Sequence, residues 1–293
     1  MHRFFVSPEQ LSHRPVTLTG AQAHQVGRVL RLRPADSVVL LDNSGMAYEA
    51  TILAQRRAGV ELAIVRSWLA GGEPAVFLTL FQAVIKGERF GWALQKGTEA
   101  GISRFVPLIC ERNVVEDRQA FAGKRARWER IIQEAAEQSG RGRLPELAEC
   151  QRFSEALLDR CAALGCRAGQ GSPGTSGEEP GAFDVREAEP GRAEDAAAAE
   201  GTTLRLIAWE AETSTGLRAA LADAALGPRP RIDLFIGPEG GWAPEEVRQA
   251  QAHGVQPVSL GPRILRAETA GVVAAAAILY AGGEMEPQGV MAA

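Results

Sequence analysis

The feature that most constrains the fold is a change in hydrophobic pattern at residues 70–74, whose sequence AGGEP is rich in turn-forming residues. Before this point, the apolar runs are short and are separated by turn sequences such as DNSG and RRAG. Runs of this kind, at residues 37–41, 46–54 and 60–65, are typical of the strands of a small antiparallel β barrel. The pattern therefore predicts a barrel domain at residues 1–72.

After residue 74, apolar runs rich in Val, Ile, Leu and Phe alternate with stretches of helical pattern. Runs without polar alternation indicate strands that are buried on both faces, as in a parallel sheet covered by helices. The predicted fold class of residues 73–285 is therefore α/β with a mostly parallel sheet. The expected strands lie at residues 76–81, 105–110, 204–209, 232–236 and 257–260, and the expected helices at residues 90–100, 126–139, 153–164, 217–225, 244–253 and 268–280.

One segment of the second domain, residues 167–200, lacks the composition of folded structure. It contains six glycines and three prolines, and its only large apolar residues are Phe183 and Val185. Such a segment cannot bury enough surface to offset its ordering entropy. We predict a disordered insertion, because strand and helix patterns resume on both sides of it.

The formal net charge of −4 argues at first against a nucleic-acid partner, because phosphate binding requires a basic surface. The insertion, however, contributes eight acids and three arginines, a charge of −5, so the rest of the chain sums to +1. Residues 1–70 contain eight arginines and five acids, and residues 86–143 contain twelve Lys or Arg and eight acids. Basic surface is therefore expected in the first half of the chain.

Several classes of protein and site are disfavoured by the sequence. No apolar run approaches the roughly 20 residues of a membrane-spanning helix, and the first residues lack the apolar stretch of a signal peptide, so we expect a cytoplasmic protein without a membrane partner. The cysteines form no CxxC pair and have no partnering histidines, so neither a metal site nor a disulfide framework is expected. They are interpreted as reduced thiols, mostly in the core, at Cys110, Cys150, Cys161 and Cys166.

The sequence LFIGPEGGW at residues 234–242 predicts a strand that ends in a glycine-rich turn before a helix. Ligands of open α/β sheets bind at the carboxyl ends of strands, and glycine allows a ligand to approach the backbone. The turn matches neither the dinucleotide pattern GxGxxG nor the P-loop, which disfavours hydrolysis of nucleoside triphosphates. A turn that needs glycine only for its backbone dihedrals is an equally good interpretation of this segment alone.

A second segment, LGPRILRAETAG at residues 260–271, leaves the last predicted strand and enters a helix of small residues. Arg266 and Glu268 lie where this helix begins. They form either an ordinary surface ion pair, which contributes little, or a pair that orders the loop around a ligand. Taken alone, the segment favours the surface pair.

Together, the sequences GPEGG and LGPRILRAETA resemble the bacterial RsmE family, which methylates N3 of a uridine in the decoding region of 16S ribosomal RNA. The resemblance covers nearly the whole chain, in order, and the chief departure is the insertion at residues 167–200. Other blocks that look like those of the family are HRFF at residues 2–5, HQVGRVLR at 24–31, KGER at 86–89, QKGTEAG at 95–101 and EQSGR at 137–141.

The resemblance implies a PUA-like RNA-binding β barrel followed by a SPOUT methyltransferase domain, whose parallel sheet ends in a C-terminal trefoil knot. It also implies S-adenosyl-L-methionine as the cofactor, a homodimer, and 16S ribosomal RNA or the assembled small ribosomal subunit as the partner. The methyl donor is expected among three loops of the knotted region. The cofactor-binding residues implied are Trp209, Glu210, Ile236, Gly237, Pro238, Glu239, Gly240, Gly241, Leu260, Gly261, Ile264, Leu265, Arg266, Glu268 and Thr269.

Methylation at uridine N3 requires that the N3 proton leaves, and the negative charge then spreads to the two carbonyl oxygens of the base. Fixed cations stabilise such charge, which makes Arg266 and Arg3 the candidates for this catalytic role. A carboxylate, Glu268 or Glu239, either accepts the proton or caps a helix, and capping is the favoured interpretation. The candidate catalytic residues are thus Arg266, Arg3 and Glu268.

The RNA must bring N3 to the donor, so the uridine is expected to swing out of its stack. Phe4 and Phe5 are either stacking platforms or core residues. Candidate RNA-binding residues, each equally interpretable as a solvated charge, are Arg3, His24, Arg28, Arg31, Lys86, Arg89, Lys96, Arg141 and Arg143; the spacing of His24, Arg28 and Arg31 puts them on one face of a helix expected at residues 21–31. The alternatives are a SPOUT methyltransferase acting on another RNA position, and a non-catalytic RNA-binding or ribosome-assembly protein.

Overall fold

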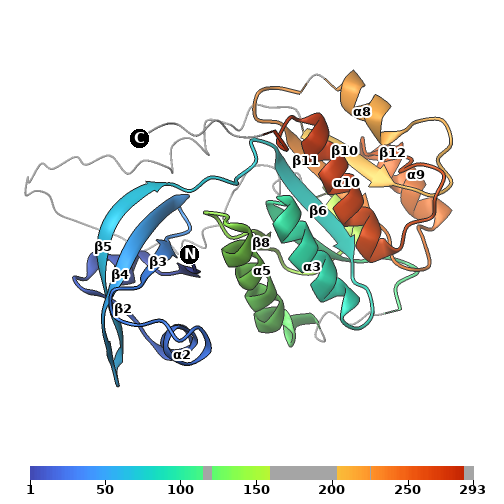
Figure 1. Cartoon of the computed structure of the whole chain (residues 1–293). Coiled ribbons are helices and arrows are strands. Elements are labelled where there is room, and N and C mark those ends of the chain that lie inside the picture. Colours follow the sequence, from blue (N-terminus) through green and yellow to red (C-terminus); the bar gives the residue numbers. More distant parts are fainter. Residues whose placement is uncertain (115–120, 159–202, 225, 287–293) are drawn as a thin grey trace, which may run out of the picture.

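The fold was determined as a computed structural model, which describes residues 1–114, 121–158, 203–224 and 226–286. The chain forms a smaller N-terminal domain built on one sheet and a larger α/β domain beside it (Figure 1). Residues 70–76 connect the last strand of the first sheet to the first strand of the second. The predicted insertion at residues 167–200 lies outside the described residues and stays a prediction.

The N-terminal domain is a five-stranded sheet with the strand order β1-β3-β4-β5-β2. Its strands are β1 (Arg3–Phe5), β2 (Val16–Leu18), β3 (Ser37–Leu41), β4 (Met46–Arg56) and β5 (Gly59–Leu69). The three predicted strands are confirmed as β3, β4 and β5. The prediction of a wholly antiparallel domain is wrong at one edge, because β1 runs parallel to β3. Closure of the sheet into a barrel stays a prediction.

Three helical segments complete this domain, α1 (Pro8–Ser12), α2 (Gly20–His24) and a π-helix η1 (Gln25–Val29). The regular helix predicted over residues 21–31 is therefore wrong in its second half, where the backbone widens into the π-helix and Arg31 takes a positive φ of 54°. His24, Arg28 and Arg31 are exposed. Phe4 and Phe5 are 1% and 8% exposed, so both are core residues.

The second domain contains a seven-stranded sheet with the order β12-β10-β11-β6-β7-β8, and β9 also pairs with β7. Every pairing in it is parallel, as the unalternated apolar runs predict. The strands are β6 (Phe77–Ala83), β7 (Arg104–Ile109), β8 (Glu146–Leu147), β9 (Gln151–Arg152), β10 (Thr203–Ala208), β11 (Arg231–Ile236) and β12 (Gln256–Val258).

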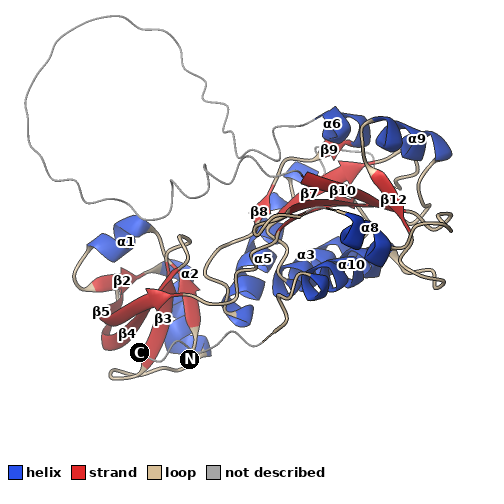
Figure 2. Cartoon of the chain, turned by 90° about the horizontal axis from the view of Figure 1, so that it is seen from above, coloured by secondary structure: helices blue, strands red, loops and turns tan. Residues whose placement is uncertain are grey.

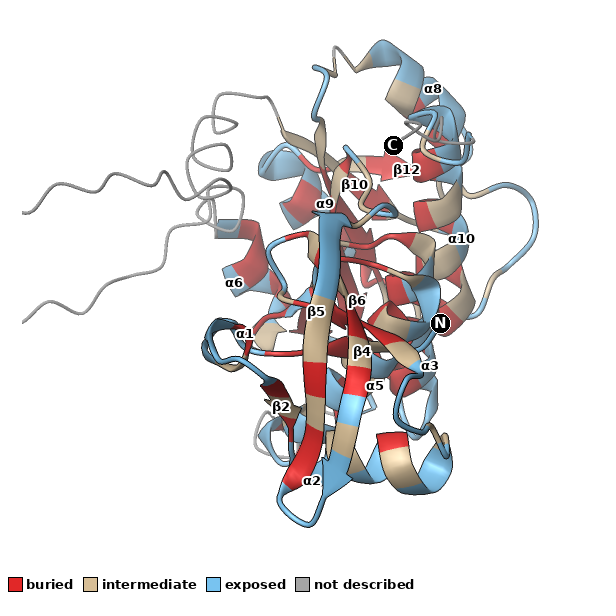
Figure 3. Ribbon diagram, turned by 60° about the vertical axis from the view of Figure 1, so that its left-hand side comes forward, coloured by how far each residue is buried: buried red, intermediate tan, exposed pale blue. Residues whose placement is uncertain are grey.

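Helices cover both faces of this sheet (Figure 2). On one face lie α3 (Arg89–Ala100), α5 (Arg125–Ser139), α8 (Leu217–Asp223) and α10 (Ala267–Ala281), and on the other α6 (Phe153–Leu158) and α9 (Pro244–Ala252). Each face has its own apolar core, and the central strands β6, β7 and β11 are buried after their first residues (Figure 3). All the expected helices are confirmed, although α6 is described only to residue 158. The trefoil knot stays a prediction.

In the described parts of the chain, no helix is long and apolar enough to span a membrane.

Candidate functional site

A pocket of about 1110 Å³ lies at the carboxyl ends of β10, β11 and β12. Its walls come from the segments that follow these strands, at residues 208–213, 236–242 and 259–270. The three strands are neighbours in the sheet, in the order β12-β10-β11, so their carboxyl ends meet at one edge. The location is therefore the one at which parallel sheets bind ligands.

The pocket brings together residues that are far apart in the sequence, from Arg89 to Ala270. The predicted cofactor-binding residues that line it are Trp209, Glu210, Ile236, Gly237, Pro238, Glu239, Gly240, Gly241, Leu260, Gly261, Ile264, Leu265, Arg266 and Glu268. Thr269 is not among the lining residues, and its N–H donates to Arg266 O at 2.8 Å in the first turn of α10. Its predicted role in cofactor binding stays a prediction.

The glycines of the turn after β11 allow close packing of its neighbours. Gly241 has a positive φ of 69°, and a Cβ there would lie 2.4 Å from Oε1 of Glu210. A Cβ on Gly237 would lie 3.0 Å from the indole of Trp242, which is buried and donates from Nε1 to Ala208 O at 2.9 Å. This hydrogen bond joins the second wall of the pocket to the first. The buried Trp242 ring therefore leaves little room for a side chain at Gly237, whereas at Gly241 the positive φ is what favours glycine, because the exposed Glu210 side chain can move.

Glu239 connects the same turn to the start of α3. Its Oε1 accepts a hydrogen bond from the Lys86 backbone N–H at 3.3 Å and forms an ion pair with Arg89 Nη1 at 3.3 Å. Arg89 lines the pocket, whereas the sequence suggested only an RNA contact for it. Lys86 and Arg89, which are both predicted to bind RNA, thus lie beside the turn that follows β11.

The third wall is the loop between β12 and α10. Leu260 and Leu265 are partly buried against the core, whereas Ile264 is 90% exposed. Arg266 is exposed at the N-cap of α10, and its carbonyl accepts from Thr269 and Ala270, both at 2.8 Å. Glu268 follows in the first turn and is only 7% exposed. The expected surface pair of Arg266 and Glu268 is therefore wrong, because Glu268 points inward and no ion pair joins the two among the described residues.

Some lining residues were not foreseen from the sequence. Four of them, Pro262, Arg263, Ala267 and Ala270, belong to the LGPRILRAETA motif but were not named as site residues, and the others lie outside that motif and the predicted cofactor-binding set. They are Arg89, Ala208, Glu212, Thr213, Trp242, Ser259, Pro262, Arg263, Ala267 and Ala270. In this group Glu212 orders the first loop: the Ser214 hydroxyl and the backbone N–H groups of Ser214 and Thr215 donate to it, which lowers the pKa of its carboxyl.

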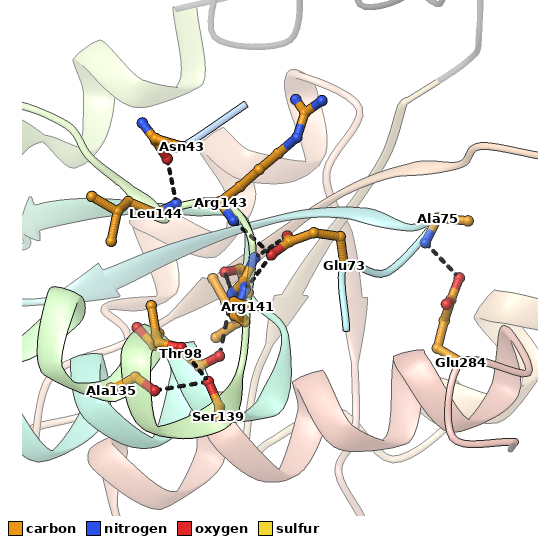
Figure 4. Close-up of polar contacts among 12 residues, drawn as sticks. Asn43, Glu73, Ala75, Thr98, Ala135, Ser139, Arg141, Arg143, Leu144 and Glu284 are labelled. Atoms are coloured by element: carbon orange, nitrogen blue, oxygen red, sulfur yellow. Dashed lines mark hydrogen bonds and ion pairs between the residues drawn. The ribbon is translucent and has the colours of Figure 1, made fainter. Parts of the chain in front are cut away.

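Arg141 is not an RNA contact, which corrects the prediction. Its side chain is 3% exposed and its donors are used within the protein (Figure 4). Nη2 and Nε bond the carboxylate of Glu73 at 2.8 and 3.2 Å, and Nη1 donates to the carbonyls of Thr98 and Ile102 at 3.2 and 2.6 Å. Glu73 lies in the connection between the domains, so this arginine fixes that connection to α3.

Other contacts hold the N-terminal sheet on α5. Oε1 of Glu137 accepts from the Phe5 N–H at 3.1 Å, and burial raises the pKa of this carboxyl. Oδ1 of Asn43 accepts from the Leu144 N–H at 2.6 Å (Figure 4). The guanidinium of Arg3 lies against Gly140 and is not part of the pocket lining. Lys96 forms a partly exposed ion pair with Glu99.

Among the described residues, no group of three or more His, Cys, Asp or Glu side chains is arranged to hold a metal ion.

The chain matches the family described as the RNA methyltransferase domain over residues 73–171 and 187–279. A pocket at the edge of a parallel sheet, in a chain that matches this family over most of its second domain, identifies the chain as an RNA methyltransferase.

Individual relatives narrow the assignment. The ribosomal RNA small subunit methyltransferase E of Synechocystis is 35% identical over 277 residues, which are 94% of this chain and 77% of the relative. The crystal structure of ribosomal RNA small subunit methyltransferase E from Neisseria gonorrhoeae bound to S-adenosyl methionine has a TM-score of 0.74 and 28% identity, and covers 96% of this chain and 98% of that one. A methyltransferase of Legionella pneumophila in complex with SAM gives the same TM-score, with 27% identity over 96% of this chain and 98% of that one. The chain belongs to the ribosomal RNA small subunit methyltransferase E family.

Proposed function

We propose that this protein transfers a methyl group from S-adenosyl-L-methionine to N3 of a specific uridine in the decoding region of 16S ribosomal RNA, in the cytoplasm. The observation that carries the proposal is the pocket at the ends of β10, β11 and β12, in a chain of the family whose Neisseria member binds S-adenosyl methionine. The substrate is either free 16S RNA or the assembled small subunit.

The pocket fits the donor in size and in chemistry. Its volume of about 1110 Å³ suits a ligand of nucleoside size with an amino-acid arm. The glycines at positions 237, 240 and 241 leave the backbone accessible for hydrogen bonds to an adenine ring, and the partly buried Leu260 and Leu265 offer apolar contact. When bound, the donor supplies a methyl group on a positively charged sulfur.

The residues of the chain then have to orient the uridine and stabilise charge on it. In the transfer, the bond from sulfur to the methyl carbon breaks, the bond from N3 to that carbon forms, and the N3 proton leaves the base. Arg266 is exposed at the pocket and is free to face the carbonyl oxygens that carry the negative charge. Arg3 is assigned the same task from the partner subunit, because it is not part of the pocket lining of its own subunit.

The RNA would lie across exposed cationic side chains of the N-terminal domain and of the pocket edge. Electrostatic contacts to phosphate position the RNA, while the pocket selects the base. The residues proposed for phosphate contact are Arg3, His24, Arg28, Arg31, Lys86, Arg89, Lys96 and Arg143; Arg141 is excluded because it is buried. A PUA-like closure of the N-terminal sheet and a trefoil knot around residues 208–270 are part of the same proposal.

A homodimer would cover apolar surface that the single chain exposes. Val273, Ala277 and Tyr280 are exposed along one side of α10, and Ile264 is 90% exposed at the pocket edge. Exposed apolar patches of this kind mark interfaces. The partner subunit would thereby come close to each donor pocket.

The test is mass spectrometry of ribosomal RNA nucleosides from a strain in which the gene is deleted. The loss of 3-methyluridine from 16S RNA, and its return when the gene is restored, is the expected result. Retention of 3-methyluridine would refute the assigned position, while a different lost modification would identify another RNA target.

A further inference from the structure

The pocket contains a buried carboxylate oxygen that has no hydrogen-bond donor. Glu268 is the second residue of α10, is 7% exposed and lines the pocket. Its Oε2 is buried and has no hydrogen-bond partner among the described residues. Buried polar atoms are nearly always paired in folded proteins, so an oxygen of this kind requires an explanation.

A second buried oxygen without a donor lies close to the same helix. Gln82 is 1% exposed near the end of β6, and its Oε1 has no partner among the described residues. This oxygen faces α10 one turn after Glu268, because a Cβ on Gly271 would lie 3.0 Å from it. The strand position of Gln82 is paired with Ile236, which lines the pocket. Gln82 does not itself line the pocket, but it lies next to the lining residue Ile236, so two buried oxygens beside the start of α10 lack donors among the described residues.

Another buried glutamate in the first turn of a helix has both of its oxygens paired, so an unpaired oxygen is not a general property of glutamates at this position. Glu246 is 6% exposed in the first turn of α9, and both of its oxygens are paired. Oε1 accepts from the Glu111 N–H at 2.8 Å, and Oε2 accepts from the Ala243 N–H at 3.0 Å. Glu246 thus closes a structural capping interaction, whereas Glu268 leaves an acceptor directed at a ligand pocket.

We propose that Glu268 recognises the positive charge of the methyl donor and that Gln82, next to the pocket lining, accepts a further hydrogen bond beside the start of α10. The proposal rests on the proposed function. The donor carries a positive sulfonium and a positive α-ammonium group, and after transfer the product S-adenosylhomocysteine keeps only the ammonium. Because a charge interaction in the protein interior is stronger than in water, the carboxylate favours a cationic ligand over a neutral one.

Isothermal titration calorimetry with S-adenosylmethionine and S-adenosylhomocysteine tests this on the full-length wild type and on Glu268→Gln, which keeps the shape and removes the charge. We expect the variant to bind S-adenosylmethionine roughly tenfold or more weakly, since a charge-assisted contact is lost. If Glu268 contacts the sulfonium, the variant binds S-adenosylhomocysteine within about twofold of the wild-type affinity. If Glu268 contacts the ammonium, the affinities for S-adenosylmethionine and S-adenosylhomocysteine both fall. Either pattern supports the proposal.

The matched control is Glu245→Gln, because Glu245 is also the second residue of its helix but is exposed and paired with Arg248. It should bind both ligands as the wild type does. Gln82→Met provides a second variant: removal of an unpaired buried acceptor should leave the melting temperature of the free protein unchanged or raised, while the increase caused by S-adenosylmethionine becomes smaller. A purely structural role for Gln82 predicts a lower melting temperature of the free protein instead.

Unchanged affinities of folded Glu268→Gln for both ligands would overturn the proposal, and a simultaneous loss of turnover would assign Glu268 to proton transfer. A wild type that binds neither ligand would instead contradict the proposed function. The two failures are thus distinguishable in one set of titrations.

Discussion

Replacement of Glu73 by glutamine tests how the two domains are held together. Glu73 lies in the connection between them and makes two contacts with the guanidinium of Arg141, at 2.8 and 3.2 Å. The same carboxylate accepts from the Arg143 backbone N–H at 3.1 Å. The variant keeps the shape of the side chain and removes its charge, so the buried guanidinium loses its counter-charge and keeps its two carbonyl acceptors and at most one amide oxygen.

The size of the effect follows from the burial of the two partners. The side chain of Arg141 is 3% exposed and that of Glu73 is 24% exposed. Breaking a fully buried ion pair costs about 3–5 kcal/mol, and the partial exposure of Glu73 reduces this to roughly 2–3 kcal/mol. For a domain of this size, the melting temperature should fall by roughly 5–10 °C.

Differential scanning calorimetry measures this directly, with Glu88→Gln as the matched control. Glu88 also pairs with an arginine of α5, Arg127, but the two side chains are 77% and 57% exposed, so the control should be nearly neutral. Methylation of RNA should fall more than the affinity for S-adenosylmethionine, because the donor pocket does not include Glu73. A Glu73→Gln variant that melts within about 1 °C of the wild type would refute the reasoning, since that difference corresponds to less than a surface pair contributes.

Three further substitutions test the pocket and the sheet. Gly241→Ala should weaken S-adenosylmethionine binding in calorimetric titrations, because a Cβ at a φ of 69° would lie 2.4 Å from Oε1 of Glu210; wild-type affinity would show that the turn can shift. Arg266→Ala should lower the methylation rate by roughly a hundredfold while circular dichroism stays unchanged, and wild-type turnover would remove this residue from the mechanism. Burial raises the pKa of Asp233 from its ordinary value of 3.8 to about 6, although Arg205 lies nearby, so between these values the folded protein holds a proton that the unfolded chain releases. Stability against urea should therefore fall as the pH rises through this window, and Asp233→Asn should flatten that part of the profile; an identical slope in both proteins would contradict the assignment.

The order and type of the main elements could be predicted because they depend on local pattern. The strands of the second domain are apolar without alternation, and each was located within about three residues of its observed bounds. The elements that were missed are those without such a pattern. The strands β8 and β9 have two residues each, and β1 is a three-residue edge whose parallel pairing with β3 is decided by long-range contacts.

The same distinction explains the errors at the site. The glycines of the turn after β11 were identified because a backbone requirement leaves a sequence signature. The role of Arg141 could not be predicted, because an arginine near other cations has the same local pattern whether it faces RNA or a buried carboxylate 68 residues away. Gln82 was missed for a related reason, since a single polar residue at the end of an apolar strand has no motif and its meaning comes from the helix that crosses it. Burial of a polar group without a partner is visible only in three dimensions, and in this protein it identifies the part of the pocket where the charge of the ligand should matter most.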